Sequence, residues 1–243
     1  MCERFGGKMP VDNIPTTHFP NSVLFTAFTP EQLQFVREHS RFRNYKTDMM
    51  VINQDDSGET LYIIAQGIVK VSMSRPDGRE IFLAVLAKGD HFGELSLIDS
   101  QFRSANVLTQ EATTLMLIDR QTFDTMLSTM PTFARNLCKS LANRARKGNE
   151  RVGNLALMSV QGLVAHHILE FAELYGQTQP NDKDILIPIR LTQNDIADIV
   201  GASRERVNQV MKTFKDNGCI SVNTQYRITV HNLNQLRRCI EMQ

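Results

Sequence analysis

The spacing of apolar residues changes once along this chain, near residue 130, and this change limits the folds that the chain can adopt. From about Tyr45 to Ile118 the sequence has short apolar segments separated by turn-forming residues, such as TLYIIAQG, IVKVSMS and REIFLAVLAKG. The Asp77-Gly78 pair lies between two alternating segments, which is typical of a β-hairpin. We therefore expect a small antiparallel β-barrel or jelly roll over residues 23–130.

After Pro131 the pattern becomes helical. Positions three and four residues apart carry apolar residues or glycine over about three heptads: Leu137, Leu141, Ala145, Gly148, Val152 and Leu155. This spacing predicts a long helix, followed by a hinge, over residues 131–158, with one side buried against another element. The buried side could lie on the chain's own barrel or pair with a second copy across a twofold axis. The second arrangement predicts a homodimer.

The C-terminal part, residues 159–243, contains two helix patterns joined by a tight turn, in LTQNDIADIVGASRERVNQVMKTF. Thr192 and Asp195 have the spacing of a capping-box variant. Gly201 can adopt the left-handed conformation at the bend, and Ser203 can cap the second helix. The segment CISVNTQYRITV then predicts two short strands, which would form a wing. Together these elements predict a winged helix-turn-helix domain, so the fold class is α+β.

The second helix of this pair could be an ordinary amphipathic surface helix or a helix that reads DNA. Polar residues that can hydrogen-bond base edges and phosphates occur along this segment: Thr192, Ser203, Arg204, Glu205, Asn208, Gln209 and Lys212. From Val160 to the end the chain has nine Lys or Arg and nine Asp or Glu, so DNA binding is not indicated by a basic excess. The polar side and the wing together predict binding to double-stranded DNA.

A candidate ligand site lies in the β-rich part, in GDHFGELSLIDSQFRSANV. Arg103 and Ser104 follow Glu94, which is part of a Gly-Glu-Leu turn. A guanidinium and a hydroxyl beside exposed backbone N–H groups suit a phosphate, because Arg binds phosphate in a bidentate manner. A nearby carboxylate can accept from ribose hydroxyls. Alternatively, Glu94 and Arg103 could form an ion pair inside the barrel.

Two segments resemble known sequences. FGELSLIDSQFRSA resembles the phosphate-binding cassette of cyclic-nucleotide-binding domains. RVGNLAL followed by LTQNDIADIVGASRERV resembles the cyclic-AMP receptor protein / fumarate-and-nitrate-reduction regulator family of bacterial transcription factors. The resemblance extends from about Leu24 to Leu236. It implies a homodimer formed through the long helices, a pseudo-palindromic operator, an effector bound between barrel and dimerisation helix, and contact with RNA polymerase at some promoters.

The resemblance also implies roles for individual residues. Glu94 would hold the ribose 2′-hydroxyl, and Arg103 with Ser104 would hold the cyclic phosphate. In the reader helix, Arg204 would contact guanine and Glu205 would contact cytosine. The other pocket residues that the resemblance implies, from the phosphate turn and the pocket lining, are Gly93, Leu95, Val71, Leu83 and Leu86.

The chain departs from the family pattern at two places. Gly148-Asn149 stands where the cyclic-AMP receptor has Thr-Ser on its dimer helix to hold adenine. Asn149 could replace one hydrogen bond, whereas Gly148 has no side chain and destabilises a helix by about 1 kcal/mol relative to Ala. The resemblance implies a cyclic nucleotide effector, with cyclic AMP as the first expectation. The space at Gly148 would suit a larger or differently placed base, so cyclic di-GMP is the second. Gln209 replaces a guanine-binding arginine, and its amide suits adenine.

Other function classes are disfavoured. An enzyme would need a nucleophile or a paired acid and base, and the sequence shows no such spacing. The four cysteines are far apart, so we expect no metal site, no disulfide framework and a reducing cytoplasm. No apolar run reaches the ~18 residues of a membrane span, and the glycines and prolines of residues 1–22 predict a loose arm.

Three alternatives to this function remain. A family member could sense 2-oxoglutarate or act without a ligand. A haem-binding branch would need an axial ligand, for which His91 is the candidate. A nucleotide-binding subunit that does not bind DNA would lack the winged helix-turn-helix pattern.

Overall fold

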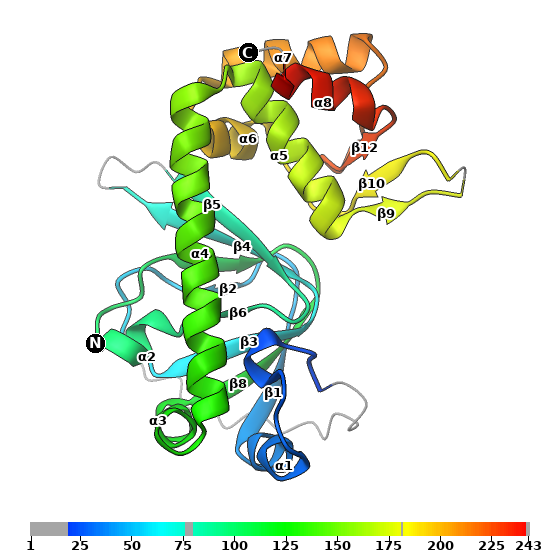
Figure 1. Ribbon diagram of the computed structural model, residues 1–243. Helices are drawn as coiled ribbons and strands as arrows, with labels where there is room; N and C mark the ends of the chain where they lie inside the picture. Colours follow the sequence, from blue (N-terminus) through cyan, green and yellow to red (C-terminus); the bar gives the residue numbers. More distant parts are fainter. Residues whose placement is uncertain (1–18, 76–79, 181, 242–243) are drawn as a thin grey trace. The chain divides into compact units, whose positions relative to one another are not determined.

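The computed structural model describes residues 19–75, 80–180 and 182–241. Most of the expected N-terminal arm and the expected turn at Asp77-Gly78 lie outside these residues. The chain forms two compact units, one made of Met1–Val71 with Val85–Ser140 and the other of Ser72–Ala84 with Leu141–Gln243. The last of the three boundaries between them falls inside the long helix α4 (Pro131–Leu157), drawn in green in Figure 1.

The N-terminal half of the chain contains two four-stranded sheets, with the strand orders β1-β8-β3-β6 and β2-β7-β4-β5. Their strands are β1 (Ser40–Tyr45), β2 (Met50–Ile52), β3 (Thr60–Gln66), β4 (Ile68–Ser74), β5 (Glu80–Ala87), β6 (His91–Phe92), β7 (Asn106–Thr109) and β8 (Thr113–Asp119). Inward-facing residues of the two sheets, among them Ile64, Val69 and Leu115, pack in one apolar cluster. The expected β-barrel is therefore confirmed.

Short helices join and cover these sheets. They are η2 (Val23–Phe25), α1 (Pro30–Glu38), α2 (Leu95–Asp99) and α3 (Arg120–Thr129). Helix α1 begins with a full capping box at Thr29 and Gln32, and α3 begins at Asp119, whose carboxylate accepts from the Thr122 backbone N–H at 2.9 Å. These local bonds set the helix starts before strand β1 and directly after strand β8.

The first half of α4 packs on the first unit. Pro131 occupies its first turn, where a missing N–H has no effect on helix hydrogen bonding. Phe133 is fully buried. The side-chain amide of Asn136 donates to the carbonyls of Leu24 and Thr26 at 3.1 and 2.8 Å. These contacts attach the start of α4 to the segment before α1.

The expected apolar seam of α4 is covered by this chain only at its beginning. Leu137 is 3% exposed, and Leu141 is partly buried. Beyond that point Ala145 and Gly148 are exposed, and Val152 and Leu155 are 68% and 42% exposed. Of the two arrangements that the sequence left open, packing on the chain's own barrel applies to the start of the helix. The later seam is exposed in this chain, and its pairing with a second copy stays a prediction.

The C-terminal half contains the expected winged helix-turn-helix. Its elements are α5 (Val160–Tyr175), β9 (Gln177–Thr178), β10 (Ile185–Ile187), α6 (Gln193–Val200), α7 (Arg204–Asp216), β11 (Ile220–Val222), β12 (Ile228–Val230) and α8 (Leu233–Glu241). Its sheet has the order β11-β12-β10-β9, and β11 and β12 form the wing. None of the helices within the described residues has the length and apolarity needed to cross a membrane.

Candidate functional site

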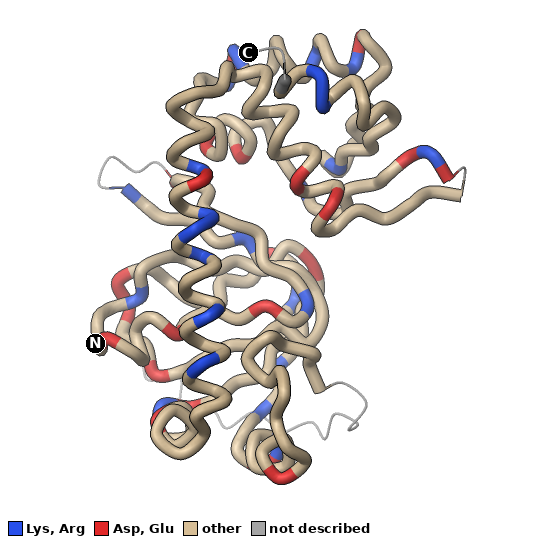
Figure 2. Tube along the Cα trace, in the orientation of Figure 1, with Lys and Arg blue, Asp and Glu red and all other residues tan. Residues whose placement is uncertain are grey.

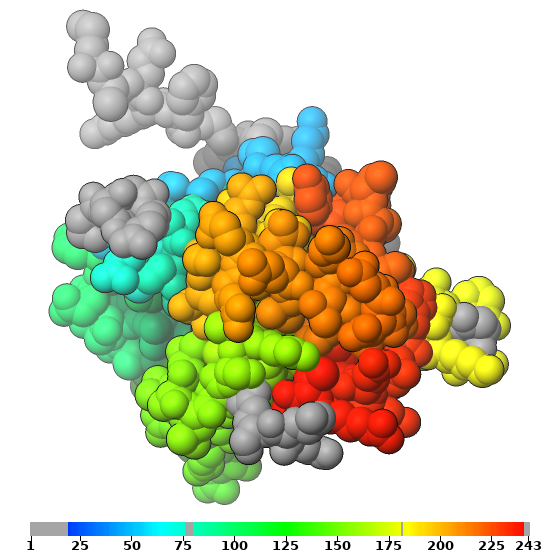
Figure 3. All heavy atoms as spheres, turned by 90° about the horizontal axis from the view of Figure 1, so that it is seen from above, coloured from blue at the N-terminus to red at the C-terminus, as the bar shows by residue number. Residues whose placement is uncertain are grey.

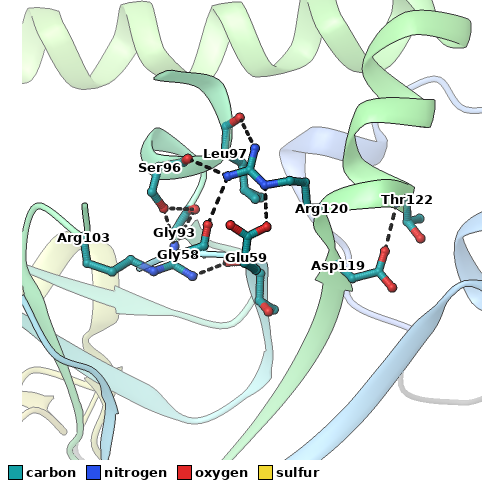
Figure 4. A network of polar contacts seen from close by, with 10 residues as sticks. Gly58, Glu59, Gly93, Ser96, Leu97, Arg103, Asp119, Arg120 and Thr122 are labelled. Atoms are coloured by element: carbon teal, nitrogen blue, oxygen red, sulfur yellow. Dashed lines mark hydrogen bonds and ion pairs between the residues drawn. The ribbon is translucent and has the colours of Figure 1, made fainter. Parts of the chain in front are cut away.

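Arg103 lies in the loop between α2 and β7 and is 6% exposed. Its Nη1 donates to the carbonyl of Gly93 at 2.7 Å and to the hydroxyl of Ser96 at 2.8 Å, and its Nη2 donates to the carbonyl of Thr60 at 2.8 Å (Figure 4). Burial lowers the pKa of this guanidinium, and the charge of Glu94 raises it. Within the described residues these three bonds use three of its five N–H groups.

Gly93 must be a glycine to hold Arg103 in this way. Its φ is 85°, in the left-handed region that disfavours other residues. A Cβ at this position would also lie 2.6 Å from Nη1 of Arg103 and 2.8 Å from the carbonyl oxygen of Thr60. Glu94 follows directly and is 1% exposed, and its charge acts on the pKa of Arg103.

Gly58 is a second required glycine, which the sequence analysis did not identify. A Cβ added to Gly58 would overlap the hydroxyl of Ser96 and would lie 2.5 Å from Nε of Arg103. The backbone of the loop before β3 therefore passes directly beside the guanidinium. Its φ is not in the left-handed region, so the need for glycine here comes from a close approach across the fold.

Arg120, at the start of α3, was also missed. Its Nε pairs with the carboxylate of Glu59, and this hydrogen bond raises the pKa of Arg120. Its Nη1 donates to the carbonyl of Leu97 at 3.1 Å, and its Nη2 donates to the carbonyls of Ser96 at 3.0 Å and Gly58 at 3.3 Å. Leu97 and Ser96 belong to α2, whose final carbonyls have no partner within the helix. Arg120 therefore ties α2 to the loop before β3 (Figure 4).

The other expected pocket residues differ in exposure. In the first unit Ser104 is exposed, Leu95 is 44% exposed, and Val71 and Leu86 pack partly buried against the apolar cluster of the sheets. In the second unit Leu83 is partly buried, while Gly148 and Asn149 are exposed. A Cβ at Gly148 would have no atom of this chain within 4 Å.

His91, the candidate haem ligand, is 1% exposed in strand β6. Its Nε2 lies 3.4 Å from the hydroxyl of Ser140 on α4. One of its two ring nitrogens therefore has a hydrogen-bonding neighbour on α4.

The two helices of the helix-turn-helix are capped as the sequence predicts. The backbone N–H of Thr192 donates to Asp195 at 2.9 Å, and the backbone N–H of Asp195 donates to the Thr192 hydroxyl at 3.2 Å. Gly201 ends α6 with a φ of 64°, and the Ser203 hydroxyl accepts from the backbone N–H of Arg206 at 3.3 Å. The hydroxyls of Thr192 and Ser203 thus serve as caps in the protein.

The expected polar side of α7 is exposed. The opposite side of the same helix is buried and carries Val207, Val210 and Phe214. Arg204, Glu205, Asn208, Gln209 and Lys212 are exposed, and the outer surface of the helix appears in orange in Figure 3. The pKa of Glu205 is lowered by a backbone hydrogen bond at the start of the helix, so this side chain is an anion near neutral pH.

Two residues that the sequence analysis did not select orient this surface. The Nε2 of Gln193, on α6, donates to Oδ1 of Asn208 at 2.9 Å. The Nη1 of Arg206 lies 3.5 Å from Oε1 of Gln209. Both contacts engage amide oxygens, so neither of them uses the NH2 group of Asn208 or Gln209. Arg206 and Gln209 are three residues apart, and side chains at this spacing are neighbours on a helix, so the sequence could have indicated this contact.

Comparison with known proteins shows that each half of the chain matches a known domain family. Residues 42–130 match the family model of the cyclic nucleotide-binding domain, and residues 164–239 match that of the Crp-like helix-turn-helix domain. The cAMP-activated global transcriptional regulator CRP of Salmonella typhimurium is 32% identical over 195 residues, covering 79% of this chain and 91% of the relative. The CRP-like cAMP-activated global transcriptional regulator of Mycobacterium tuberculosis is 31% identical over 197 residues, covering 81% and 87%.

Solved structures share the fold. A transcriptional regulator of the CRP/FNR family from Thermus thermophilus has a TM-score of 0.69 at 19% identity, covering 83% of this chain and 98% of that one. The c-di-GMP responsive global regulator CLP of Xanthomonas campestris has a TM-score of 0.68 at 21% identity, covering 82% and 98%.

Proposed function

Because the chain belongs to the CRP/FNR family of DNA-binding transcription regulators, we propose that it acts as a homodimer whose binding to a pseudo-palindromic operator is controlled by a cyclic nucleotide. The observation that carries the proposal is the buried Arg103 guanidinium, on which the charge of Glu94 acts and whose hydrogen bonds within the described residues use three of its five N–H groups. A desolvated, oriented guanidinium is suited to a phosphate diester, because both remaining donors can bind in a fixed geometry.

Each cassette residue has a role in this proposal. Arg103 binds the cyclic phosphate, and Ser104 adds a hydroxyl donor from the exposed end of the loop. The backbone between Gly93 and Leu95 closes the phosphate turn. Glu94 accepts from a ribose hydroxyl, and the apolar side chains of Val71, Leu83 and Leu86 contact the base or sugar.

Cyclic AMP is the first effector that we propose, since the relatives at 31–32% identity are named as cAMP-activated regulators. Cyclic di-GMP is the second. The exposed Gly148, which lacks a side chain where the family holds adenine, supports this alternative because its surroundings in this chain are open.

The homodimer would form through the exposed part of the α4 seam. An apolar stripe that ends in Val152 and Leu155 is unfavourable in water and is suited to burial against an identical helix. Lys and Arg residues occur along α4 (Figure 2), and we propose that their side chains remain on its outer sides. A twofold axis between the helices would present two copies of α7 to two half-sites of DNA. RNA polymerase is the further partner that we propose at some promoters.

The proposed reading of DNA follows from the exposed side of α7. Arg204 is placed to bind O6 and N7 of guanine, and Glu205 to accept from the amino group of cytosine. Gln209 would suit adenine, and Lys212 would contact a phosphate. Phosphate contacts position the helix, whereas base contacts give sequence preference.

The test combines titration calorimetry and DNA selection on the full chain. We expect one of cyclic AMP, cyclic GMP and cyclic di-GMP to bind, and Arg103→Met to lose most of the affinity, since charge-assisted bonds are worth about 1.5–3 kcal/mol each. Selection from random DNA with that nucleotide should return a pseudo-palindrome. Binding of 2-oxoglutarate alone, or the same selected sites and affinities with and without every nucleotide, would refute control by a cyclic nucleotide.

A further inference from the structure

A third arginine, Arg151 on the second half of α4, contacts two segments that are far apart in the sequence. Its Nη1 donates to the carbonyl of Leu83 at 2.9 Å. Its Nη2 donates to the carbonyls of Phe82 at 3.2 Å and Ile199 at 3.1 Å. Phe82 and Leu83 belong to strand β5, and Ile199 lies in the last turn of α6. All four residues lie within the second compact unit, so Arg151 joins a strand of the β-barrel to the helix-turn-helix.

The atoms that accept hydrogen bonds from Arg151 are suited to its partly buried positive charge. All three hydrogen bonds of Arg151 within the described residues go to main-chain carbonyls. Burial lowers the pKa of this guanidinium and the charge of Glu170 raises it, and arginine stays protonated in proteins. The end of α6 carries the negative end of the helix dipole, which stabilises a cation. Strand β5 is the last strand of its sheet, so carbonyls on its outer edge have no neighbouring strand.

Each of the two segments leads along the chain into a functional site. Strand β5 continues from Leu83 to Leu86, which packs against the apolar cluster of the sheets. Helix α6 ends at Gly201 in the left-handed conformation, and α7 begins at Arg204. A shift of β5 would therefore reach the start of the reader helix through one side chain and one tight turn.

We propose that Arg151 is a positioning residue for regulation, which holds β5 and α6 together so that effector binding at the barrel changes how α7 is presented to DNA. This inference rests on the proposed function. A residue with a merely structural role would alter stability, and it would leave the ratio of operator affinities with and without effector unchanged.

Three variants of the full chain test the proposal. Arg151→Met keeps an unbranched side chain and removes every donor. Arg151→Lys keeps the charge, but its single ammonium group cannot reproduce the planar arrangement of donors that serves two segments. Arg146→Met is the matched control, because Arg146 is exposed on the same helix and loses the same charge. Urea unfolding establishes that each variant is folded.

The first measurement is amide hydrogen exchange without nucleotide. We expect residues 80–84 and 196–202 both to exchange about fivefold faster in Arg151→Met, because the bond that joins them is lost. The Arg146→Met control should match the unmodified protein in both segments.

The second measurement is the Kd for a selected operator, with and without saturating cyclic AMP and then cyclic di-GMP. We expect Arg151→Met to reduce the effect of nucleotide on operator affinity by about tenfold, a typical coupling between sites, while nucleotide affinity stays within about threefold. Arg151→Lys should give an intermediate ratio.

An unchanged ratio in Arg151→Met, or faster exchange in only one segment or in neither, would overturn the proposal. If neither nucleotide alters operator binding by the unmodified protein, the proposed effectors are wrong, and the exchange measurement decides whether Arg151 links β5 and α6. If Arg151→Met does not fold, the same two measurements on Arg151→Lys decide.

Discussion

The hydroxyl of Ser96 lies 2.8 Å from Nη1 of Arg103, so the guanidinium that we assign to phosphate binding is anchored to helix α2. The carbonyl of the same serine accepts from Arg120 at 3.0 Å. Two arginines thus hold one residue of the cassette, one through its side chain and one through its backbone. The orientation of Arg103 therefore depends on a residue at the start of α3.

Replacing Arg120 with Met should weaken nucleotide binding without removing a ligand contact. Without Arg120, α2 and the loop before β3 lose their common donor, and Arg103 becomes less ordered. We expect about a fivefold loss of affinity for the cyclic nucleotide, measured by calorimetry, and little further loss when Arg120→Met is added to Arg103→Met. The exposed neighbour Gln121→Met is the control. If Arg120→Met caused the same loss of nucleotide affinity with Arg103 in place and in the Arg103→Met protein, Arg120 would not act through Arg103.

Gly58→Ala should destabilise the first unit. The new methyl group would overlap the Ser96 hydroxyl and crowd Arg103, and overpacking of this kind typically costs about 1–3 kcal/mol. Urea unfolding measures the change, and adding Ser96→Ala should recover part of it. Gly153→Ala is the matched control, since its Cβ would meet no atom of this chain within 4 Å and alanine favours a helix. A Gly58→Ala protein as stable as the original would show that the loop moves freely.

Val152→Glu should disrupt the proposed homodimer. The side chain is 68% exposed in the isolated chain, so a carboxylate is tolerated there, whereas two facing carboxylates in a dimer would be desolvated and repel. Light scattering should show a dimer for the original protein and a mass near 27.6 kDa for the variant. Lys139→Glu, outside the seam, should remain dimeric. A monomeric original protein at micromolar concentration would exclude the dimer.

Substitutions on α7 should separate base reading from phosphate binding. Arg204→Ala should weaken the selected operator by about 1–3 kcal/mol and random DNA far less, because it loses a contact with guanine. Lys212→Ala should weaken both about equally and reduce the salt dependence by about one phosphate. Gln209→Arg should shift its base pair toward guanine. Competition binding with sequence selection measures all three, and a profile unaffected by Arg204→Ala and Gln209→Arg would exclude α7 as the reader.

His166 on α5 should make stability fall in mild acid. Burial lowers the pKa of His166 below its usual 6.5, and the neighbouring His167 lowers it further. The unfolded chain therefore binds a proton first, so this contribution to stability is present above pH 6.5 and is lost as pH falls toward the folded pKa. The Nε2 of His166 lies 3.2 Å from the amide of Asn154, a contact that needs a neutral ring.

Urea unfolding at pH 7.5 and 5.5 tests this effect. The original protein should lose more stability between the two pH values than His166→Gln does, whereas the exposed His39→Gln variant should lose as much as the original. The same loss in His166→Gln as in the original protein would place the acid sensitivity elsewhere.

Features that depend on neighbours in the chain could be read from the sequence. The reciprocal cap of Thr192 and Asp195, the left-handed Gly201 and the Ser203 cap each involve residues within four positions, so composition and spacing predict them. The start of the long helix α4 after Met130 follows from helical periodicity in the same way. The motif around Arg103 also identified the candidate cassette.

Tertiary structure alone decided what surrounds the arginines. The acceptors of Arg103 include a carbonyl 43 positions away, and those of Arg120 and Arg151 lie up to 62 and 69 positions away. Main-chain carbonyls occur at every residue and leave no signature in the side chains, so no periodicity or spacing indicates which of them a guanidinium will reach. The need for glycine at position 58 arises in the same way, because it depends on two side chains that the fold brings from beyond residue 95.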